Sequence, residues 1–497
     1  MIALLLLALL SDALALRGSL PVFPLPRSIS AHGPRIALAP LAVETGTAPV
    51  HAHVRAALAR FQARLAPLPA ASAGSSAPVL SRLALAVARP GDAALSDATD
   101  YAYTLTVDST SGISITAATP YGAVYALETL AQLVEQGGTH LQHDSVRIED
   151  SPSFAWRGLM IDAGRRFFPM PAVANLLDTM LAVKLNVLHL HASDECRWGV
   201  ESKLFPNLTA SLSGVLGGFY TQEDIGLLVA YAEARGIRII PEFDVPSHSR
   251  GLRPAKSSGV VFCEDVESQS QIYGDPAGST LGVLTQLFDE MAGLFPDPVF
   301  HIGADETSAL GPCTTDSTFA LERQVLNHLE GALNKTAAGW EEVLFDAGAA
   351  TNKTVVYAWS RHTPQEIISA GRRAVDSVSG DFYMTAPAPP YPGGWKNFWY
   401  DISTGVDAAS LPSLLGGEMS MWTDTCECPV LLARRGGAAA ALHTHTRTAP
   451  RLSPPPPPHT PQTATLSSAA PLRAGPRWAR RSSPPSATQS SRPAWAA

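Results

Sequence analysis

The sequence predicts an α/β protein in which a (β/α)8 TIM barrel follows a small α+β domain. From Phe154 to about Val430, short apolar β-runs alternate with helical stretches, and eight such runs occur in series. Acidic and aromatic residues gather directly after these runs, at the strand ends where a parallel barrel builds its active site. Residues 20–152 instead carry strand-like runs and one helical stretch, which is typical of an α+β domain.

The first residues predict a signal peptide. The run at residues 2–10, IALLLLALL, is apolar but too short to span a bilayer, and the small residues Ala13 and Ala15 follow it. We therefore expect residues 1–17 to be a cleaved leader; the alternative is an uncleaved core segment. This leader would send the protein into the secretory pathway, to a lysosome, a vacuole or the extracellular space. Three N-glycosylation sequons fit that route, beginning at Asn207, Asn334 and Asn352.

The domain at residues 20–152 is predicted to be non-catalytic. Its clearest strands are YAYTLTV at residues 101–107 and GISITA at residues 112–117. A helix is predicted over residues 121–136, because apolar residues there recur at three- and four-residue spacing. The segment contains no cluster of acids and no motif that carries chemistry.

The barrel strands are predicted from buried β-runs in the second part of the chain. One of them is weak, the run that ends at Trp340. The other seven are GLMID (158–162), NVLHLH (186–191), RIIPEF (238–243), VFHIG (299–303), VVYAW (355–359), AVDSV (374–378) and LLGGEMS (414–420).

The most informative motif is HIGADET, at residues 301–307. It places Asp305 and Glu306 side by side after an apolar run that a glycine closes. Two adjacent carboxylates cannot both ionise cheaply in a cleft of low dielectric, so one of them tends to keep its proton and can act as an acid. Glycoside hydrolysis needs such a proton donor. A bare Asp-Glu pair is more often a solvated loop start, and only its surroundings favour catalysis.

Composition narrows the classes of partner. The chain has 497 residues, of which 46% are hydrophobic and 16% charged, and a net charge of −8. This acidic balance, with a sequence pI near 6.0, argues against nucleic acid as a ligand. A neutral or weakly polar substrate suits it better.

Seven segments in the same order resemble the β-N-acetylhexosaminidases of glycoside hydrolase family 20. The resemblance runs from about residue 22 to about residue 427, and its core is the HIGADE signature. The other segments are WRGLMIDAGRRFFP (156–169), KLNVLHLHASDE (184–195), YAEARGIRIIPEFDVPSHS (231–249), GWEEVL (339–344), VVYAWS (355–360) and LGGEMSMW (415–422).

This resemblance implies an exo-acting enzyme that removes terminal β-linked N-acetylglucosamine or N-acetylgalactosamine. Glu306 would be the general acid and base, and Asp305 would hydrogen-bond the acetamido N–H of the substrate. The substrate's own acetamido oxygen would attack the anomeric carbon and give an oxazolinium ion with net retention. No metal and no organic cofactor are then needed. The expected partners are oligosaccharide, N-glycan, glycolipid or chitin-oligomer substrates and a homodimer mate, with no nucleic acid and no stable membrane span.

The resemblance also implies a set of residues that hold the sugar. Arg157 would grip two hydroxyls with its planar fork, although a surface ion pair is the plainer alternative for this residue. Asp194 and His248 would support the catalytic acid, and Tyr383 would hydrogen-bond the acetamido oxygen. Three tryptophans at successive strand ends favour a sugar platform over core packing: Trp340, Trp359 and Trp422.

This chain departs from the family pattern at three positions. Glu195 stands where many members have a second Asp, and Thr385 where Asp or Asn is usual. Asp424 replaces a Glu that contacts sugar hydroxyls, so its reach is shorter by one methylene. Asp424 remains a candidate for substrate binding. Glu418 is expected to orient other groups rather than to touch sugar.

The cysteines predict one disulfide. In an oxidising compartment Cys263 and Cys313 are the natural pair, because they flank the strand that carries the acid motif. Cys426 and Cys428 are separated by one residue, which makes a mutual disulfide strained. A zinc site is not expected there, since no further ligand lies at suitable spacing.

The final segment, residues 433–497, predicts a disordered tail. It contains AAAAL, PPPPP and repeated Ser, Pro, Arg and Ala, and it has too few aliphatic residues to form a core. Family members instead end with an amphipathic helix that closes the barrel, so we expect a barrel over residues 154–430 that lacks this helix. The tail is then either a truncated or frameshifted sequence or a genuine extension.

Two other functions stay open at this point. The missing helix favours a catalytically impaired carbohydrate-binding homologue. A retaining glycosidase with two protein carboxylates about 5 Å apart is the second alternative, and the adjacency of Asp305 and Glu306 argues against it.

Overall fold

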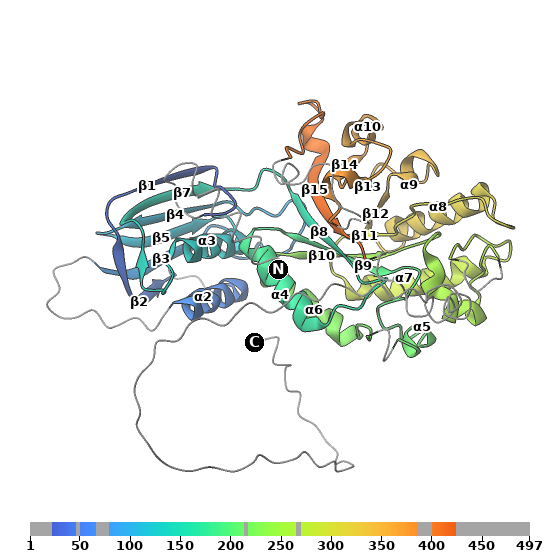
Figure 1. Ribbon diagram of the computed structural model, residues 1–497, viewed down its shortest axis with the longest axis horizontal. Helices are drawn as coiled ribbons and strands as arrows, with labels where there is room; N and C mark the ends of the chain where they lie inside the picture. The colour runs from blue at the N-terminus through green and yellow to red at the C-terminus, as the bar shows by residue number, and fades with distance from the viewer. Residues whose placement is uncertain are drawn as a thin grey trace, which may run out of the picture. The chain divides into compact units, whose positions relative to one another are not determined.

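The first folded region is a seven-stranded sheet with two helices (Figure 1). The computed structural model describes residues 22–45, 50–65, 79–212, 217–264, 270–384 and 400–423. The predicted signal peptide, the tail at 433–497, Thr385, Asp424, Cys426 and Cys428 lie outside these residues. In the order β1-β7-β4-β5-β3-β2-β6, the strands are Ser28–His32, Ser145–Asp150, Tyr103–Asp108, Gly112–Ala117, Val79–Val87, Ile36–Glu44 and His140–Leu141.

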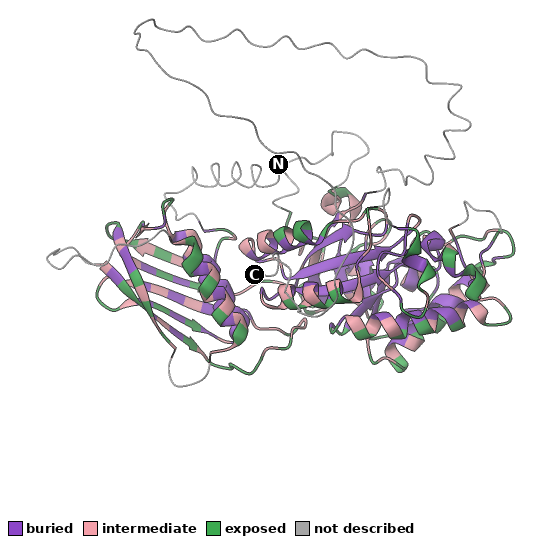
Figure 2. Cartoon of the chain, turned by 90° about the horizontal axis from the view of Figure 1, so that it is seen from below, coloured by how far each residue is buried: buried purple, intermediate pink, exposed green. Residues whose placement is uncertain are grey.

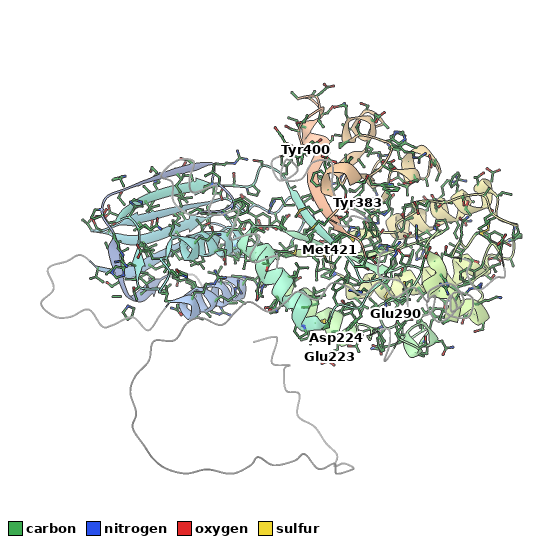
Figure 3. The ribbon with its side chains drawn as sticks, in the orientation of Figure 1. Glu223, Asp224, Glu290, Tyr383, Tyr400 and Met421 are labelled. Atoms are coloured by element: carbon green, nitrogen blue, oxygen red, sulfur yellow. A yellow bond between two sulfur atoms is a disulfide. The ribbon has the colours of Figure 1, made fainter. Side chains whose placement is uncertain are left out.

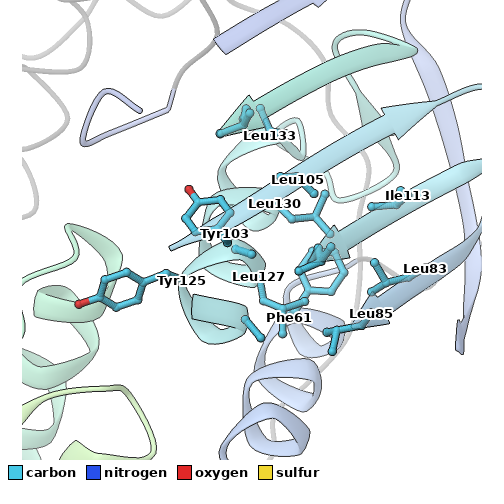
Figure 4. Close-up of a cluster of buried hydrophobic side chains, with 14 of the residues drawn as sticks. Phe61, Leu83, Leu85, Tyr103, Leu105, Ile113, Tyr125, Leu127, Leu130 and Leu133 are labelled. Atoms are coloured by element: carbon cyan, nitrogen blue, oxygen red, sulfur yellow. The ribbon is translucent and has the colours of Figure 1, made fainter. Parts of the chain in front are cut away.

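One face of this sheet is covered by the helices α2 (Ala52–Arg64) and α3 (Pro120–Leu133). Helix α3 begins where the Thr119 hydroxyl accepts backbone N–H groups and Pro120 supplies a preset φ, which together make a strong start signal. Leucines and aromatic rings from α2, α3 and the sheet pack into one core, as Figure 4 shows for Phe61, Leu105 and Leu127. The predicted helix is confirmed, although α3 ends three residues earlier than expected.

The second region is a closed barrel of eight parallel strands, so the predicted fold class is confirmed. Figure 2 shows these strands as almost wholly buried. Every predicted strand is present, including the weak one before Trp340. The strands are β8 (Trp156–Asp162), β9 (Val187–Ser193), β10 (Arg238–Phe243), β11 (Val299–His301), β12 (Thr336–Trp340), β13 (Val355–Ala358), β14 (Arg373–Asp376) and β15 (Leu414–Met421).

Helices connect these strands and cover the barrel. Helices α6, α8 and α10 each begin with a reciprocal capping box, in which a threonine and the residue three positions later satisfy each other's backbone N–H groups. No helix in the described part of the chain is long and apolar enough to cross a membrane. The helices are α4 (Met170–Ala182), α5 (Asn207–Ala210), α6 (Gln222–Glu233), α7 (Ser279–Leu294), α8 (Thr315–Gly331), α9 (Glu342–Phe345), α10 (Pro364–Ser369) and α11 (Ser379–Phe382), with 3-10 turns η2 (Ser249–Ser258) and η4 (Leu411–Ser413).

The two ends of the barrel differ in what they contain. At the N-terminal end, Arg238 forms a buried bidentate ion pair with Asp297, at 2.7 and 2.9 Å. At the C-terminal end, the strands lead into loops that carry Asp305, Glu306, Trp359 and Trp422. The predicted disulfide between Cys263 and Cys313 is confirmed and ties together the loops on either side of β11.

Candidate active site

The acids Asp305 and Glu306 sit on a tightly bent loop that follows β11. Gly303, Ala304 and Glu306 all have positive φ, at 70°, 69° and 54°. Gly303 cannot be replaced, because a Cβ there would lie 2.0 Å from Oδ1 of Asp244. For a residue with a side chain, such a conformation costs about 1–3 kcal/mol and persists only where the surroundings impose it. The strain is therefore concentrated at the proposed catalytic acid itself.

His248 joins the two acids. Its Nε2 lies 3.2 Å from Oε2 of Glu306 and 3.5 Å from Oδ2 of Asp305. His248 also has a positive φ, of 50°, at the start of η2. The other ring nitrogen, Nδ1, lies 3.5 Å from Oδ1 of Asp194. The structure thus brings together four of the predicted residues: Asp194, His248, Asp305 and Glu306.

The charges in this group are set by burial and by pairing. Burial opposes a charge on His248, but Asp305 and Asp194 outweigh that effect and raise its pKa well above the usual value. Burial raises the pKa of Asp305, whereas the hydrogen bond from His248 lowers the pKa of Glu306. The two neighbouring acids are thus shifted in opposite directions, and Glu306 is the one that pairs, ionised, with His248.

Asp194 is held in place by three donors. His191 Nε2 lies 2.9 Å from Oδ2 of Asp194, and Nη2 of Arg165 lies 2.9 Å from the same oxygen. The backbone N–H of Glu195 donates to the other oxygen, Oδ1. Burial would raise the pKa of Asp194, but Arg165 and His248 lower it below the ordinary value. Asp194 is consequently a fixed negative charge behind His248.

Four aromatic rings line the site next to the acids. The rings of Trp340 and Trp422 lie 5.9 Å apart, and Trp359 lies 6.4 Å from Trp340. Tyr383 stacks on Trp359 at 6.4 Å and 9°, and lies 6.1 Å from Trp422. Figure 3 labels Tyr383, which forms a bridge to β15 at Ser420. The structure therefore brings all four predicted rings together as one aromatic wall.

One of the predicted residues, Arg157, does not belong to the site. Arg157 lies at the start of β8, so its side chain belongs to the opposite end of the barrel, about 20 Å along the strand. Its guanidinium donates to the backbone oxygens of Lys184 and Phe154 and to the Tyr125 hydroxyl, at 2.9, 2.6 and 3.1 Å. An arginine whose donors are used in this way supports the fold and does not reach a sugar.

The arginine that does reach the site is Arg165, just past the end of the same strand. Its Nη1 lies 3.0 Å from Oδ2 of Asp162, Nη2 pairs with Asp194, and its guanidinium lies 5.3 Å from the Trp422 ring centroid. The sequence contained the signal, because the residues IDAGRR follow the apolar run whereas WRG precedes it. In a parallel barrel only the former position can be catalytic.

Two further acids behind the aromatic wall were also missed. Glu342 is 6% exposed and accepts the Trp359 Nε1 hydrogen bond at 3.0 Å. Burial, with Asp305 nearby, raises the pKa of Glu342 to about 7. Glu341 accepts the backbone N–H groups of residues 359–362 and so fixes the loop after β13. The dipeptide directly after Trp340, Glu-Glu, was the available signal.

Some histidines and acids near the site are of the types that bind divalent cations. Four of the clusters whose ligand atoms converge within 4.8 Å involve His191 or His248 with Asp244 or Asp194. His191, however, faces carboxylates with both ring nitrogens, Glu242 at 2.5 Å and Asp194 at 2.9 Å, so it has no lone pair to offer. The described geometry is that of a hydrogen-bonded network.

The comparisons with known proteins agree over both regions. The model of glycosyl hydrolase family 20, catalytic domain, matches residues 154–430, and that of glycosyl hydrolase family 20, domain 2, matches residues 19–151. The β-hexosaminidase subunit β of Mus musculus is 29% identical over 351 residues, which cover 65% of this chain and 64% of the mouse subunit. The chain therefore spans slightly less than two thirds of that relative.

Two solved structures share the fold. A chitobiase from Flavobacterium johnsoniae superposes with a TM-score of 0.67 at 27% identity, over 81% of this chain and 65% of the chitobiase. An exo-β-N-acetylglucosaminidase from Vibrio harveyi, solved in complex with N-acetylglucosamine, gives a TM-score of 0.67 at 26% identity. That match covers 83% of this chain and 71% of the Vibrio enzyme.

Proposed function

This chain belongs to glycosyl hydrolase family 20, and we propose on that premise that it is an exo-β-N-acetylhexosaminidase. One observation carries the proposal: Asp305 and Glu306 leave β11 together, share Nε2 of His248, and adjoin the aromatic wall. Two acids held by a histidine, next to tryptophan rings, suit the binding of a neutral sugar that has an apolar face. Support comes also from the hexosaminidase relatives, one of which was solved with N-acetylglucosamine.

The proposed reaction needs no nucleophile from the protein. The acetamido oxygen of the substrate forms a bond to the anomeric carbon while the bond to the leaving oxygen breaks. Glu306 gives its proton to that leaving oxygen, and later takes a proton from the water that opens the oxazolinium ring. Asp305 accepts the acetamido N–H and stabilises the positive charge on the ring. Its Oδ1 atom is suited to this role, because it is buried and has no hydrogen-bond partner among the described residues.

Glu306 must be protonated before it can act, although its carboxylate pairs with His248 in the free protein. The Glu306 side chain is 60% exposed, so water stabilises its charge. A bound sugar would exclude this water and raise the pKa of Glu306, because desolvation disfavours the charged form. Proton uptake by Glu306 on substrate binding is therefore part of the proposal.

The remaining residues bind the sugar. Arg165 takes the role that the sequence suggested for Arg157, since its guanidinium lies beside the Trp422 ring and pairs with Asp194 at the site. Trp340, Trp359 and Trp422 would enclose the acetamide and one face of the pyranose, and Tyr383 would contact the acetamido oxygen. Asp424 stays a candidate for sugar hydroxyls. The natural substrates proposed are oligosaccharides, N-glycans, glycolipids or chitin oligomers, and a homodimer is the proposed assembly.

A secretory route is proposed together with this activity. The Cys263–Cys313 disulfide belongs to an oxidising compartment. Asn207 is exposed at the first residue of α5, where a glycan can attach. Loss of mass after treatment with an amide-cleaving N-glycosidase would support this route, and a secreted protein with no change in mass would contradict glycosylation.

The activity is tested with two chromogenic substrates that differ only at carbon 2. We expect turnover of a p-nitrophenyl N-acetyl-β-glucosaminide and none of the matching β-glucoside, which has no acetamide to attack. Equal turnover of the two would instead favour a glycosidase with two protein carboxylates. Tight binding of N-acetylglucosamine without turnover would favour the catalytically impaired homologue.

A further inference from the structure

A chain of buried histidines and carboxylates runs through the barrel interior and ends at the catalytic acid. Glu242, on β10, is fully buried, and its Oε2 lies 2.5 Å from Nδ1 of His191. The opposite ring nitrogen of His191 contacts Asp194 at 2.9 Å, and Asp194 in turn faces His248. His248 then contacts Glu306 at 3.2 Å. Each residue thus contacts the next through named atoms from β10 to the acid, and the Asp194–His248 contact, at 3.5 Å, is the longest and is not a hydrogen bond.

The same chain extends away from the site. His189 Nδ1 lies 2.7 Å from Oε1 of Glu418, and its Nε2 lies 3.0 Å from Oε2 of Glu242. Trp156 Nε1 donates to Glu418 at 2.9 Å, and Trp340 Nε1 donates to Glu242 at 3.1 Å. The latter bond links Glu242 also to the aromatic wall.

These groups stand where a barrel usually has branched aliphatic residues. Layers of Val, Ile and Leu commonly fill a barrel interior, and the free energy lost when a charge is removed from water can exceed what its pairing returns. An apolar layer would serve stability at least as well. The presence of buried histidines and carboxylates inside this barrel therefore indicates a role other than packing.

We propose that Glu242 and His191 are positioning residues that fix the Asp194–His248 support of Glu306 from inside the barrel. This inference rests on the proposed function and adds two residues that hold its catalytic acid in place. Both ring nitrogens of His191 face carboxylate oxygens, so each must carry a hydrogen, and Glu242 balances the resulting charge. His191 and Arg165 then hold Oδ2 of Asp194, and Oδ1 of Asp194 faces His248.

The electrostatics agree with this geometry. Burial opposes a charge on His191, yet Glu242 and Asp194 raise its pKa well above the ordinary value. Burial would raise the pKa of Glu242, but the surrounding imidazoles lower it well below that value. The titratable groups that interact with Glu242 are His189 and His191 on β9, His301 on β11, Tyr357 on β13, Asp244 just past its own strand, Asp305 and Tyr383.

The first experiment is a double-mutant cycle measured as kcat against pH. Glu242→Gln should lower kcat about ten- to a hundredfold, the range for outer partners of functional histidines, with little change in KM. The basic limb of the kcat–pH profile of this variant should move to lower pH, because His191 and then His248 lose their protons more easily. Asp194→Asn should lower kcat further, and the double variant should be no slower than Asp194→Asn alone.

The control is Glu128→Gln, which removes a buried carboxylate paired with Arg64 in the sheet domain. It should leave the pH profile unchanged. Effects of Glu242→Gln and Asp194→Asn that multiply, with an unshifted profile, would show that Glu242 has only a structural role and would overturn the proposal.

A second measurement does not depend on activity or on a folded variant. In wild-type protein with nitrogen-15 in its histidine rings, the His191 signals should report a doubly protonated ring at pH 7. A neutral His191 ring with one protonated nitrogen would refute the proposal, whatever the enzyme hydrolyses. If that ring is charged but no N-acetylhexosaminide is cleaved, the proposed function fails and the inferred network stands.

Discussion

The two ends of strand β8 carry two arginines that the structure uses in opposite ways. Arg157 lies at the start of the strand and donates hydrogen bonds to two backbone oxygens and a tyrosine hydroxyl, between the barrel and the sheet domain. Arg165 follows the strand and shares its donors with Asp162 and Asp194, beside a tryptophan of the aromatic wall. The residue type is the same, so position relative to the strand's direction decides the role.

The same contrast holds for the two ends of the barrel. At the N-terminal end, Nε and Nη2 of Arg238 form a buried bidentate pair with Asp297, and Lys335 donates to two backbone oxygens. At the C-terminal end, His248 and Glu306 have strained backbones and Asp305 Oδ1 has no described partner. Positive φ also occurs at the N-terminal end, at Lys184 and Asn334, so the two ends differ chiefly in the acids, the histidine and the aromatic rings that gather at the C-terminal end.

The largest expected effect comes from the acid at the C-terminal end. Glu306→Gln should lower turnover of a substrate with a poor leaving group by about 100- to 10,000-fold, because the amide keeps the shape but has no proton to give. Binding of N-acetylglucosamine should change little. The matched control is Glu149→Gln, an exposed residue paired with Arg147 in the sheet domain, which should retain full turnover. Near wild-type turnover of the Glu306 variant would remove this residue from the mechanism.

The two arginines provide the next test of the comparison. Arg165→Lys should lower kcat/KM about 10- to 100-fold, since the loss of hydrogen bonds to charged groups costs about 1.5–3 kcal/mol. Arg157→Lys should leave kcat/KM of the folded protein unchanged and lower the free energy of unfolding by about 1–3 kcal/mol. Steady-state kinetics and urea unfolding measure the two effects. A kinetic loss at Arg157 that exceeds the loss at Arg165 would reverse the assignment.

A smaller effect is expected from Glu342, through the pH dependence of stability. Its pKa is about 7 in the folded protein, above the ordinary 4.5, so the folded state holds this proton longer than the unfolded chain does. Stability therefore declines as the pH rises from about 4.5 to about 7, by about 3 kcal/mol at most. Glu342→Gln should remove this decline and still accept the Trp359 hydrogen bond.

The Glu342 prediction is checked by unfolding at pH 5 and at pH 8. Glu223→Gln, on the exposed first turn of α6 (Figure 3), is the control and should keep the wild-type slope. If wild type and Glu342→Gln lose the same free energy of unfolding between the two values, Glu342 does not bind the extra proton.

Much of the architecture could be predicted from the sequence, because its signals are local. Each barrel strand is an apolar run, and the helix start at Thr119–Pro120 follows ordinary capping chemistry. The acids, the aromatic wall and His248 could be predicted because they directly follow such runs. The disulfide could be predicted for the same reason, since its cysteines flank one strand.

The errors and omissions have physical causes. Arg157 and Arg165 lie in one motif, and only the direction of the strand separates the structural arginine from the functional one. Glu242, His189 and His191 lie within strands, where the sequence cannot say which side chains face the interior without the register of the closed barrel. Glu342 is recognised only through its contact with Trp359, which comes directly after the next strand, β13.

The central claim is that the C-terminal end of the barrel is shaped for a cyclised, positively charged N-acetyl sugar. The most direct measurement is the affinity of a thiazoline analogue of N-acetylglucosamine, compared with the free sugar, in wild type and in Asp305→Asn. We expect the analogue to bind at least about 100-fold more tightly than the sugar in wild type, as intermediates of this kind do. Asp305→Asn should remove most of that advantage, because it takes away the negative partner. Equal affinities for the two ligands in wild type would contradict the account.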